Sequence, residues 1–191
     1  MRVHISPGNQ KLGEIPNVST SPRAACNPAA PCTRSGCYAA RALRYPHTRT
    51  AWRENLYLAQ HERPRFFNVI GRYLQKKQPR FFRWHVAGDI LDADYLQRMH
   101  HTAQENPNTL FLAFTKRHEL SFPRAPENLS IVFSQWPQWQ HVTRRRPRAW
   151  MQDGTETRIP ANALECPGNC ENCGFCWNLK KIGRDVFFLK H

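Results

Sequence analysis

Seven cysteines stand in two tight groups, one toward each end of the 191-residue chain. The first group is Cys26, Cys32 and Cys37, and the second is Cys166, Cys170, Cys173 and Cys176. A disulfide framework would spread an even number of cysteines through a small secreted domain, whereas this number is odd. The spacing favours thiolate ligation of a soft metal or an iron–sulfur cluster. We therefore expect a reducing, cytoplasmic setting and no secretory leader.

The amino-terminal group has the spacing C-x5-C-x4-C. Three thiolates in one loop can hold three irons of a [4Fe–4S] cube and leave the fourth iron open to a substrate or cofactor. Zinc and unliganded thiols are the alternatives, but three cysteines lack the fourth ligand that a closed structural zinc site needs. We expect a cluster here, in a long loop that takes its fold from the bound group.

The carboxyl-terminal group has the spacing C-x3-C-x2-C-x2-C, which is similar to that of cluster-binding ferredoxins. Zinc sites usually separate their two CxxC pairs by a dozen residues or more, so a second cluster is expected and zinc is the alternative. The first three of these cysteines also match the C-x3-C-x2-C motif of radical S-adenosylmethionine (SAM) enzymes. Asn172 stands where that motif has an aromatic residue, and the motif normally follows the first strand of the barrel. We therefore assign the open cluster to the amino-terminal group.

The strong positive charge of the chain predicts an anionic partner. Lys and Arg number 28 against 14 Asp and Glu, a net charge of +14. Nucleic acid is the leading candidate and an anionic membrane surface the lesser one. The run Arg144, Arg145, Arg146, Pro147, Arg148 is predicted to contact phosphates, with a solvated loop as the alternative. No apolar run approaches the roughly 18 residues that cross a bilayer, so we expect no membrane span.

Strands and helices must position these groups, and the middle of the chain alternates between them. We expect helices from residue 38 onward with a break near Pro46, and also over 64–77 and 94–106. Expected strands cover 81–86, 109–114, 129–133 and 186–189, and the segment 140–165 is expected to be irregular. Alternation at this spacing predicts parallel βαβ units with right-handed crossovers, and hence an α/β fold.

Polar or glycine-containing residues follow each of the three middle strands. They are Gly88 and Asp89, then Thr115, Lys116 and Arg117, then Ser134 and Gln135. Ligands of parallel α/β folds bind at the carboxyl ends of strands, so we expect these residues to line one site. A plainer reading is that Gly88 makes a turn, Asp89 caps the next helix, and Lys116 and Arg117 are solvated.

Four stretches of the chain resemble phage-encoded radical-SAM-like proteins, most closely the gene product 88 family. They are Asn9–Gly13, Cys26 with Cys32 and Cys37–Arg41, His85–Asp89, and Phe114–Arg117. The resemblance runs from about residue 8 to about residue 177. It implies a partial (β/α)6 TIM-like barrel of radical SAM type with a [4Fe–4S] cluster at its mouth. The chain would then be one domain over 1–191, with a cluster-binding loop at 1–37 and an auxiliary-cluster segment at 160–191.

The resemblance also implies cofactors and residue roles. The cofactors are two [4Fe–4S] clusters and SAM, and a reductase or flavodoxin-type protein would supply electrons. Gly88-Asp89 is similar to the Gly-Gly-Glu element that contacts the SAM amino group, although its acid is shorter. The implied cofactor-binding residues are Tyr38, Gly88, Asp89, Thr115, Lys116, Arg117, Ser134 and Gln135, with Asp89 and Lys116 also catalytic.

The function expected from these observations is the radical modification or rearrangement of a nucleobase in phage DNA, in the host cytoplasm. A base inside a duplex would have to be flipped out of the stack. Two alternatives remain open. One is a non-catalytic iron–sulfur or zinc protein that binds nucleic acid, and the other is a radical SAM enzyme acting on RNA or a small molecule.

Overall fold

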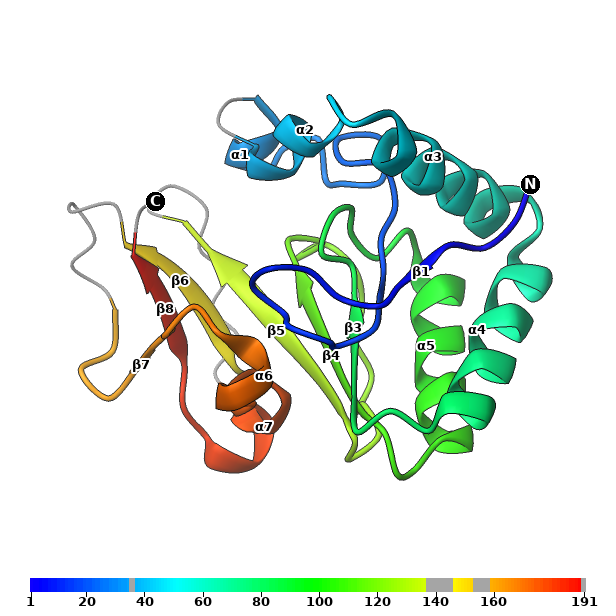
Figure 1. The fold of residues 1–191 in the computed structure, drawn as a ribbon. Coiled ribbons are helices and arrows are strands. Elements are labelled where there is room, and N and C mark those ends of the chain that lie inside the picture. The colour runs from blue at the N-terminus through cyan, green and yellow to red at the C-terminus, as the bar shows by residue number, and fades with distance from the viewer. Residues whose placement is uncertain (35–36, 137–145, 153–158, 190–191) are drawn as a thin grey trace.

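The computed structural model describes residues 1–34, 37–136, 146–152 and 159–189. These residues form one eight-stranded sheet with the order β1-β2-β3-β4-β5-β6-β8-β7 (Figure 1). β1 pairs with β2 in antiparallel fashion, and every other neighbouring pair is parallel. The strands are β1 Ile5–Ser6, β2 Asn17–Val18, β3 Phe81–Trp84, β4 Leu110–Thr115, β5 Leu129–Gln135, β6 Arg148–Gln152, β7 Leu164–Glu165 and β8 Val186–Leu189.

The helices begin where the local sequence favours a helix start. They are α1 Pro31–Arg34, α2 Tyr38–Ala42, α3 Pro46–His61, α4 Arg63–Lys77, α5 Ala93–Glu105, α6 Cys170–Cys173 and α7 Phe175–Ile182. Proline stands in the first turn of α3 and of α4, where its missing N–H costs nothing. The side chain of Asp92 caps α5 by accepting the backbone N–H of Tyr95 at 2.9 Å. In the described ranges, no helix is long and apolar enough to cross a membrane.

Two hydrophobic layers cover the two faces of the sheet. On one face, α3, α4 and α5 pack against β3, β4 and β5, and fully buried aromatic side chains such as Phe66, Trp84 and Phe111 fill the interface. On the other face, α7 packs against β4 and β5, and its Trp177 indole donates to the carbonyl of Phe82 at 3.2 Å. Because side chains alternate along a strand, neighbouring residues of β3 serve opposite layers: Trp84 faces the first and Phe81 the second.

The expectation of a mostly parallel α/β fold is confirmed. The helix expected over 64–77 spans 63–77, and the last strand has the predicted bounds. The described strands form an open sheet whose edges are β1 and β7, so no closed barrel is present in this part of the chain. The radical SAM character of the fold stays a prediction.

The expectation of an irregular segment over 140–165 is wrong in part. β6 and β7 both begin within it. β6 lies between β5 and β8 and pairs with both, and its Ala149 and Trp150 are buried. β6 forms because it pairs with a strand on each side and is buried, although its five residues show little of the apolar pattern that predicts a strand.

Candidate cluster site at the carboxyl ends of the parallel strands

The amino-terminal cysteine loop, with α1 and α2, crosses above the carboxyl ends of the central strands (Figure 1). Cys26 precedes α1, Cys32 lies in α1, and Cys37 is the residue before α2. All three thiols are half-buried and free. Asn27 ties the loop to the end of β4, because its amide donates to the carbonyl of Lys116 at 3.3 Å and to the carboxylate of Glu119 at 2.8 Å.

Asp89 joins the end of β3 to the end of β4. Its buried carboxylate accepts the hydroxyl of Thr115 at 2.7 Å and the backbone N–H groups of Lys116 and Ile90, each at 2.8 Å. Burial raises the pKa of Asp89, although these hydrogen bonds and the Lys116 ammonium oppose the shift. Asp89 therefore positions the β4 end, and it is Asp92 that caps the following helix.

Lys116 carries the positive charge of this site. Burial opposes its charged form, but interactions with Cys32, Asp89, Tyr38 and Cys26 raise its pKa above the ordinary value. The sequence predicted that these residues converge, and the structure brings them within electrostatic reach of one another. An ammonium beside thiols favours their ionised, metal-binding form.

The thiols of Cys26 and Cys32 are protonated at neutral pH without a bound metal. Burial, assisted by Asp89, raises the pKa of Cys26 to about 11, and burial also raises that of Cys32. Among the residues that the structure describes, no group of three or more His, Cys, Asp or Glu side chains is arranged to hold a metal ion as it stands. The donors are nevertheless soft, as iron–sulfur clusters and zinc require, and ligation would displace their protons.

The loop after β3 adopts two left-handed backbone conformations. Gly88 has φ +86°, and a Cβ added there would lie 1.9 Å from the hydroxyl oxygen of Thr20. His85 has φ +52° and is buried, with its Nε2 3.0 Å from the Tyr95 hydroxyl. Tyr38 holds α2 onto this loop by donating its hydroxyl to the carbonyl of Val86 at 2.5 Å. The loop thus anchors both the cysteine segment and the site carboxylate.

Other predicted cofactor-binding residues are engaged elsewhere. The guanidinium of Arg117 donates to the carbonyls of Ile90 and Leu91 and forms an ion pair with Glu119, so it braces the loop. Ser134 and Gln135 are buried at the end of β5, and the Gln135 amide donates to the carbonyl of Phe133 at 3.3 Å. Their contact with SAM stays a prediction.

The predicted nucleic-acid-binding arginines fall in two classes. Arg144 and Arg145 lie outside the described residues. Arg146 stacks over Phe122 and Phe133, and Arg148 forms a 2.8 Å ion pair with the buried Asp185. The two described arginines therefore already have partners within the protein.

The four carboxyl-terminal cysteines line one small pocket beside α6 and α7, together with Trp177 and Val186. All four are free thiols, and electrostatic interactions couple Cys176 to the other three. Burial raises the pKa of Cys176 to about 12. Four soft donors around one pocket fit a cluster or a zinc ion.

Arg83 faces this second group and was not predicted. It lies in β3, its guanidinium stacks over Phe114 at 4.4 Å, and its charge favours the thiolate forms of Cys170 and Cys176. Its Nε is buried without a hydrogen-bond partner among the described residues. A buried donor of this kind fits the sulfide or thiolate of a bound cluster. The sequence carried one signal that could have identified Arg83, which is a charged residue between the aromatic residues of an otherwise apolar strand.

The amino-terminal turn Asn9–Gly13 supports the same group. The backbone N–H of Cys170 donates to the carbonyl of Lys11 at 2.9 Å, and the N–H of Glu14 donates to the Glu171 carboxylate at 3.3 Å. The Asn9 side chain holds the turn by accepting the N–H groups of Lys11 and Leu12. The sequence identified this turn only as part of a resemblance.

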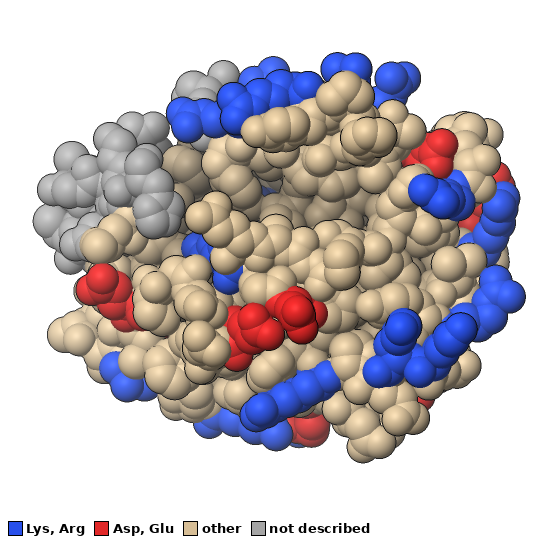
Figure 2. Space-filling model, viewed as in Figure 1, with Lys and Arg blue, Asp and Glu red and all other residues tan. Residues whose placement is uncertain are grey.

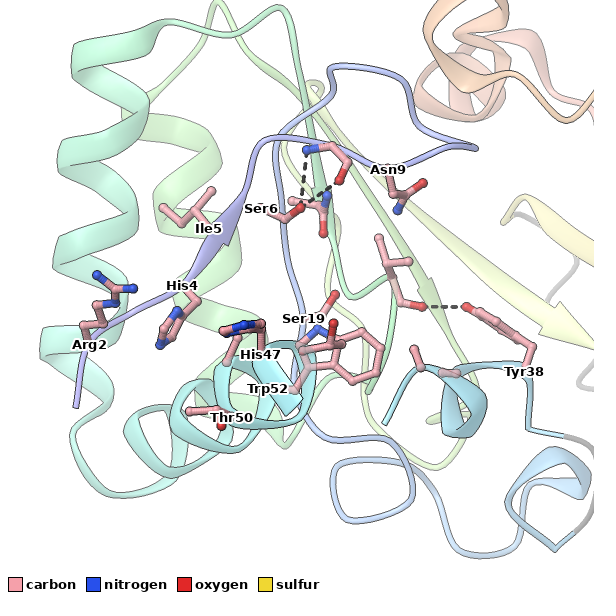
Figure 3. A pocket seen from close by; sticks show the side chains of 17 residues that line it. Arg2, His4, Ile5, Ser6, Asn9, Ser19, Tyr38, His47, Thr50 and Trp52 are labelled. Atoms are coloured by element: carbon pink, nitrogen blue, oxygen red, sulfur yellow. Dashed lines mark hydrogen bonds between the residues drawn. The ribbon is translucent and has the colours of Figure 1, made fainter. Parts of the chain in front are cut away.

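A cavity of about 680 Å³ opens beside the amino-terminal cysteine loop (Figure 3). Its walls come from the amino-terminal segment, β2, the β3 loop, α2 and α3. Tyr38, the residue after Cys37, forms part of the wall. A ligand in this cavity would therefore lie next to the first cysteine group.

The comparisons with known proteins agree with the resemblance at the level of family. The family model described as Gene product 88 matches residues 5–179, which is most of the chain. No curated protein and no solved structure matches the chain significantly. With its cysteine loop, strand-end carboxylate and carboxyl-terminal thiols inside the matched range, the chain belongs to the Gene product 88 family.

Proposed function

We propose that this protein is an iron–sulfur enzyme of the radical SAM type that modifies a base of DNA. The observation that supports this most is the convergence of Cys26 and Cys32 with Lys116 and Asp89 at the carboxyl ends of β3 and β4. Cys37 lies within electrostatic reach of Cys32. Ligands of parallel α/β folds bind at this edge of the sheet. The cavity beside the cysteine loop provides room for a further ligand.

The first group would hold the open cluster, with Cys26, Cys32 and Cys37 as ligands. Such a cluster, with SAM bound and one electron from a reductase or flavodoxin-type donor, would supply the radical chemistry that removes a hydrogen atom from an unactivated carbon. Lys116 would neutralise the charge of the thiolates and hold a carboxylate group of the ligand. Asp89 fixes the backbone from which Lys116 projects, and Tyr38 fixes the cysteine loop against the β3 loop.

The second group would hold an auxiliary cluster on Cys166, Cys170, Cys173 and Cys176. Arg83 would donate its unpartnered Nε–H to that cluster and balance its charge. The net charge of +14 supports a nucleic-acid substrate, since long-range attraction to phosphates raises both affinity and association rate.

The test is anaerobic reconstitution of the full chain with iron and sulfide, followed by iron, sulfide and zinc analysis. We expect close to two [4Fe–4S] clusters in the wild type and close to one in each of two triple variants. These are Cys26→Ala/Cys32→Ala/Cys37→Ala and Cys170→Ala/Cys173→Ala/Cys176→Ala. Reduction with SAM should yield 5′-deoxyadenosine from the wild type and from the second variant only. Stoichiometric zinc without sulfide would instead support a zinc protein that binds nucleic acid.

A further inference from the structure

The stretch between Glu14 and Glu54 contains six arginines and no acidic residue. Four of these arginines lie on α2, on α3 and in the turn between them, and all four are exposed. We name them the arginine face: Arg41, Arg44, Arg49 and Arg53. Figure 2 shows basic side chains gathered over α2 and α3. In the described part of the chain, none of the four forms an ion pair with a carboxylate.

Exposed aromatic rings lie among these arginines. Tyr38 is 68% exposed, Tyr45 53% and Tyr57 42%. The guanidinium of Arg44 stacks over the ring of Tyr45 at 4.9 Å. Alternation of free cations with flat exposed rings is typical of surfaces that bind single-stranded nucleic acid, where phosphates meet the cations and bases stack on the rings.

The same two helices form one wall of the 680 Å³ cavity. Figure 3 shows Trp52 and His47 on α3 directed toward this space. Trp52 is half-buried yet belongs to neither hydrophobic cluster of the sheet, so its ring is not needed to fill the core. The cavity also has the size of small-ligand sites, and the amide nitrogen of Asn9, whose oxygen holds the turn, is a donor that can meet the edge of a base.

We propose that the arginine face binds the phosphate backbone of a nucleic-acid strand and that one base of the strand enters the adjacent cavity, against Trp52. The inference rests on the proposed function for the chemistry that follows, but the binding itself requires no cluster. It assigns the main phosphate contacts to α2 and α3, whereas the sequence pointed to residues 144–148. Arg146 and Arg148 are already held by aromatic rings and by Asp185, which supports this choice.

The first test compares two variants that each remove three positive charges. One is Arg41→Gln/Arg49→Gln/Arg53→Gln, and its control is Arg72→Gln/Lys76→Gln/Lys77→Gln on the exposed side of α4. The probe is a fluorescein-labelled single-stranded DNA oligonucleotide, read by anisotropy across a salt series, with the same sequence as RNA and as duplex. We expect the first variant alone to flatten the log–log salt slope, by up to about 2.1 on single strands and about 2.7 on duplex.

The second test concerns the cavity. Trp52→Leu should weaken binding of single-stranded DNA by about 5-fold to 150-fold, which is the range that loss of one base–aromatic stack produces. The control Tyr73→Leu removes a partly buried aromatic ring of α4 and should leave the affinity unchanged. Circular dichroism of all variants establishes that each is folded, so that a loss of binding is a loss of contacts.

Equal effects of the two charge variants would overturn the proposal, because binding would then follow net charge alone. Wild-type binding to anionic phospholipid vesicles but to no oligonucleotide would overturn it in favour of a membrane surface. If the arginine face and Trp52 prove necessary but reconstitution yields no cluster, the inference stands and the proposed function fails. If instead the protein carries clusters and cleaves SAM, but neither the arginine-face variant nor Trp52→Leu changes its affinity for DNA, the proposed function stands and the inference fails.

Discussion

The carboxylate of Asp89 accepts the backbone N–H of Lys116 at 2.8 Å, and so joins the loop after β3 to the end of β4, within electrostatic reach of Cys26 and Cys32. The second oxygen of the same carboxylate accepts the Thr115 hydroxyl at 2.7 Å. One buried acid therefore fixes the backbone from which the ammonium of Lys116 projects. The geometry of the site depends on this single side chain.

Asp89→Asn should destabilise the protein by about 1–3 kcal/mol, because an amide nitrogen would face a donor in place of a carboxylate oxygen. The loss of charge should also lower the pKa of Lys116, since Asp89 helps to raise it. Urea unfolding measures the first effect. The control is Asp94→Asn, an acid with a half-exposed side chain whose removal should cost no more than about 1 kcal/mol. Similar losses in the two variants would contradict the structural role of Asp89.

Gly88→Ala should cost more than about 1 kcal/mol, because its φ of +86° is strained for any other residue and the new methyl would meet the Thr20 hydroxyl. Adding Thr20→Ala removes the nearest atom and should restore part of the stability, leaving the backbone strain. The thermal midpoints of the two single variants and the double variant provide the measurement. If the losses in thermal midpoint of the two single variants simply add in the double variant, the close approach of Thr20 is not what requires glycine at position 88.

His85 predicts a stability loss in acid. Burial, assisted by the charge of Arg83, lowers its pKa from 6.5 to about 3. Below about pH 6.5 the His85 side chain is therefore protonated in the unfolded chain but stays neutral in the folded chain. The free energy of unfolding consequently falls as the pH drops from 6.5 toward 3. Between pH 7 and pH 5 this contribution amounts to about 2 kcal/mol.

The variant for this measurement is His85→Asn, since asparagine tolerates the positive φ of the position. The variant should have a lower free energy of unfolding than the wild type at pH 7. This difference should be smaller by about 2 kcal/mol at pH 5, because only the wild type loses stability through His85. If the free energies of unfolding of the two proteins change with pH in parallel, the pKa of His85 is not lowered by folding.

Arg83→Leu should lower the reduction potential of a cluster reconstituted on the carboxyl-terminal cysteines, because a nearby positive charge favours the more negative, reduced state. An electron-paramagnetic-resonance redox titration of reconstituted protein gives the potential. Arg80→Leu is the control, since Arg80 is exposed and stacks on Phe81 at the start of the same strand. If the reduction potential is unchanged in Arg83→Leu, the charge of Arg83 does not act on a cluster at the second cysteine group.

The sequence predicted those parts of the fold whose pattern is local and repeated. Helix α4 and strands β3, β4 and β5 were recognisable because each carries several apolar residues at its own period. β6 was not recognisable, because Arg148 begins it and its burial depends on the two strands beside it. Periodicity within one segment contains no information about such neighbours.

The site was predictable to a similar degree. Parallel strands end at one edge, so the meeting of Asp89 and Lys116 followed from the order of elements. The place of the cysteine loop at that edge was implied only by the family resemblance. The direction of Arg117 did not follow, because it depends on two carbonyls of the preceding loop. The partnership of Arg83 with the second thiol group also required the fold, since β3 and α6 lie far apart in the chain.

The contact of Lys11 with Cys170 has a consequence for how the protein is made. A ribosome releases the turn that contains Lys11 well before it releases α6, the helix that the turn supports. β8, which pairs with both β6 and β7, emerges later still. The second thiol pocket can therefore assemble only after β8 has left the ribosome, whereas the first cysteine loop can meet the ends of β3 and β4 earlier on the growing chain. The two thiol groups would therefore become structured in a fixed order, the first before the second.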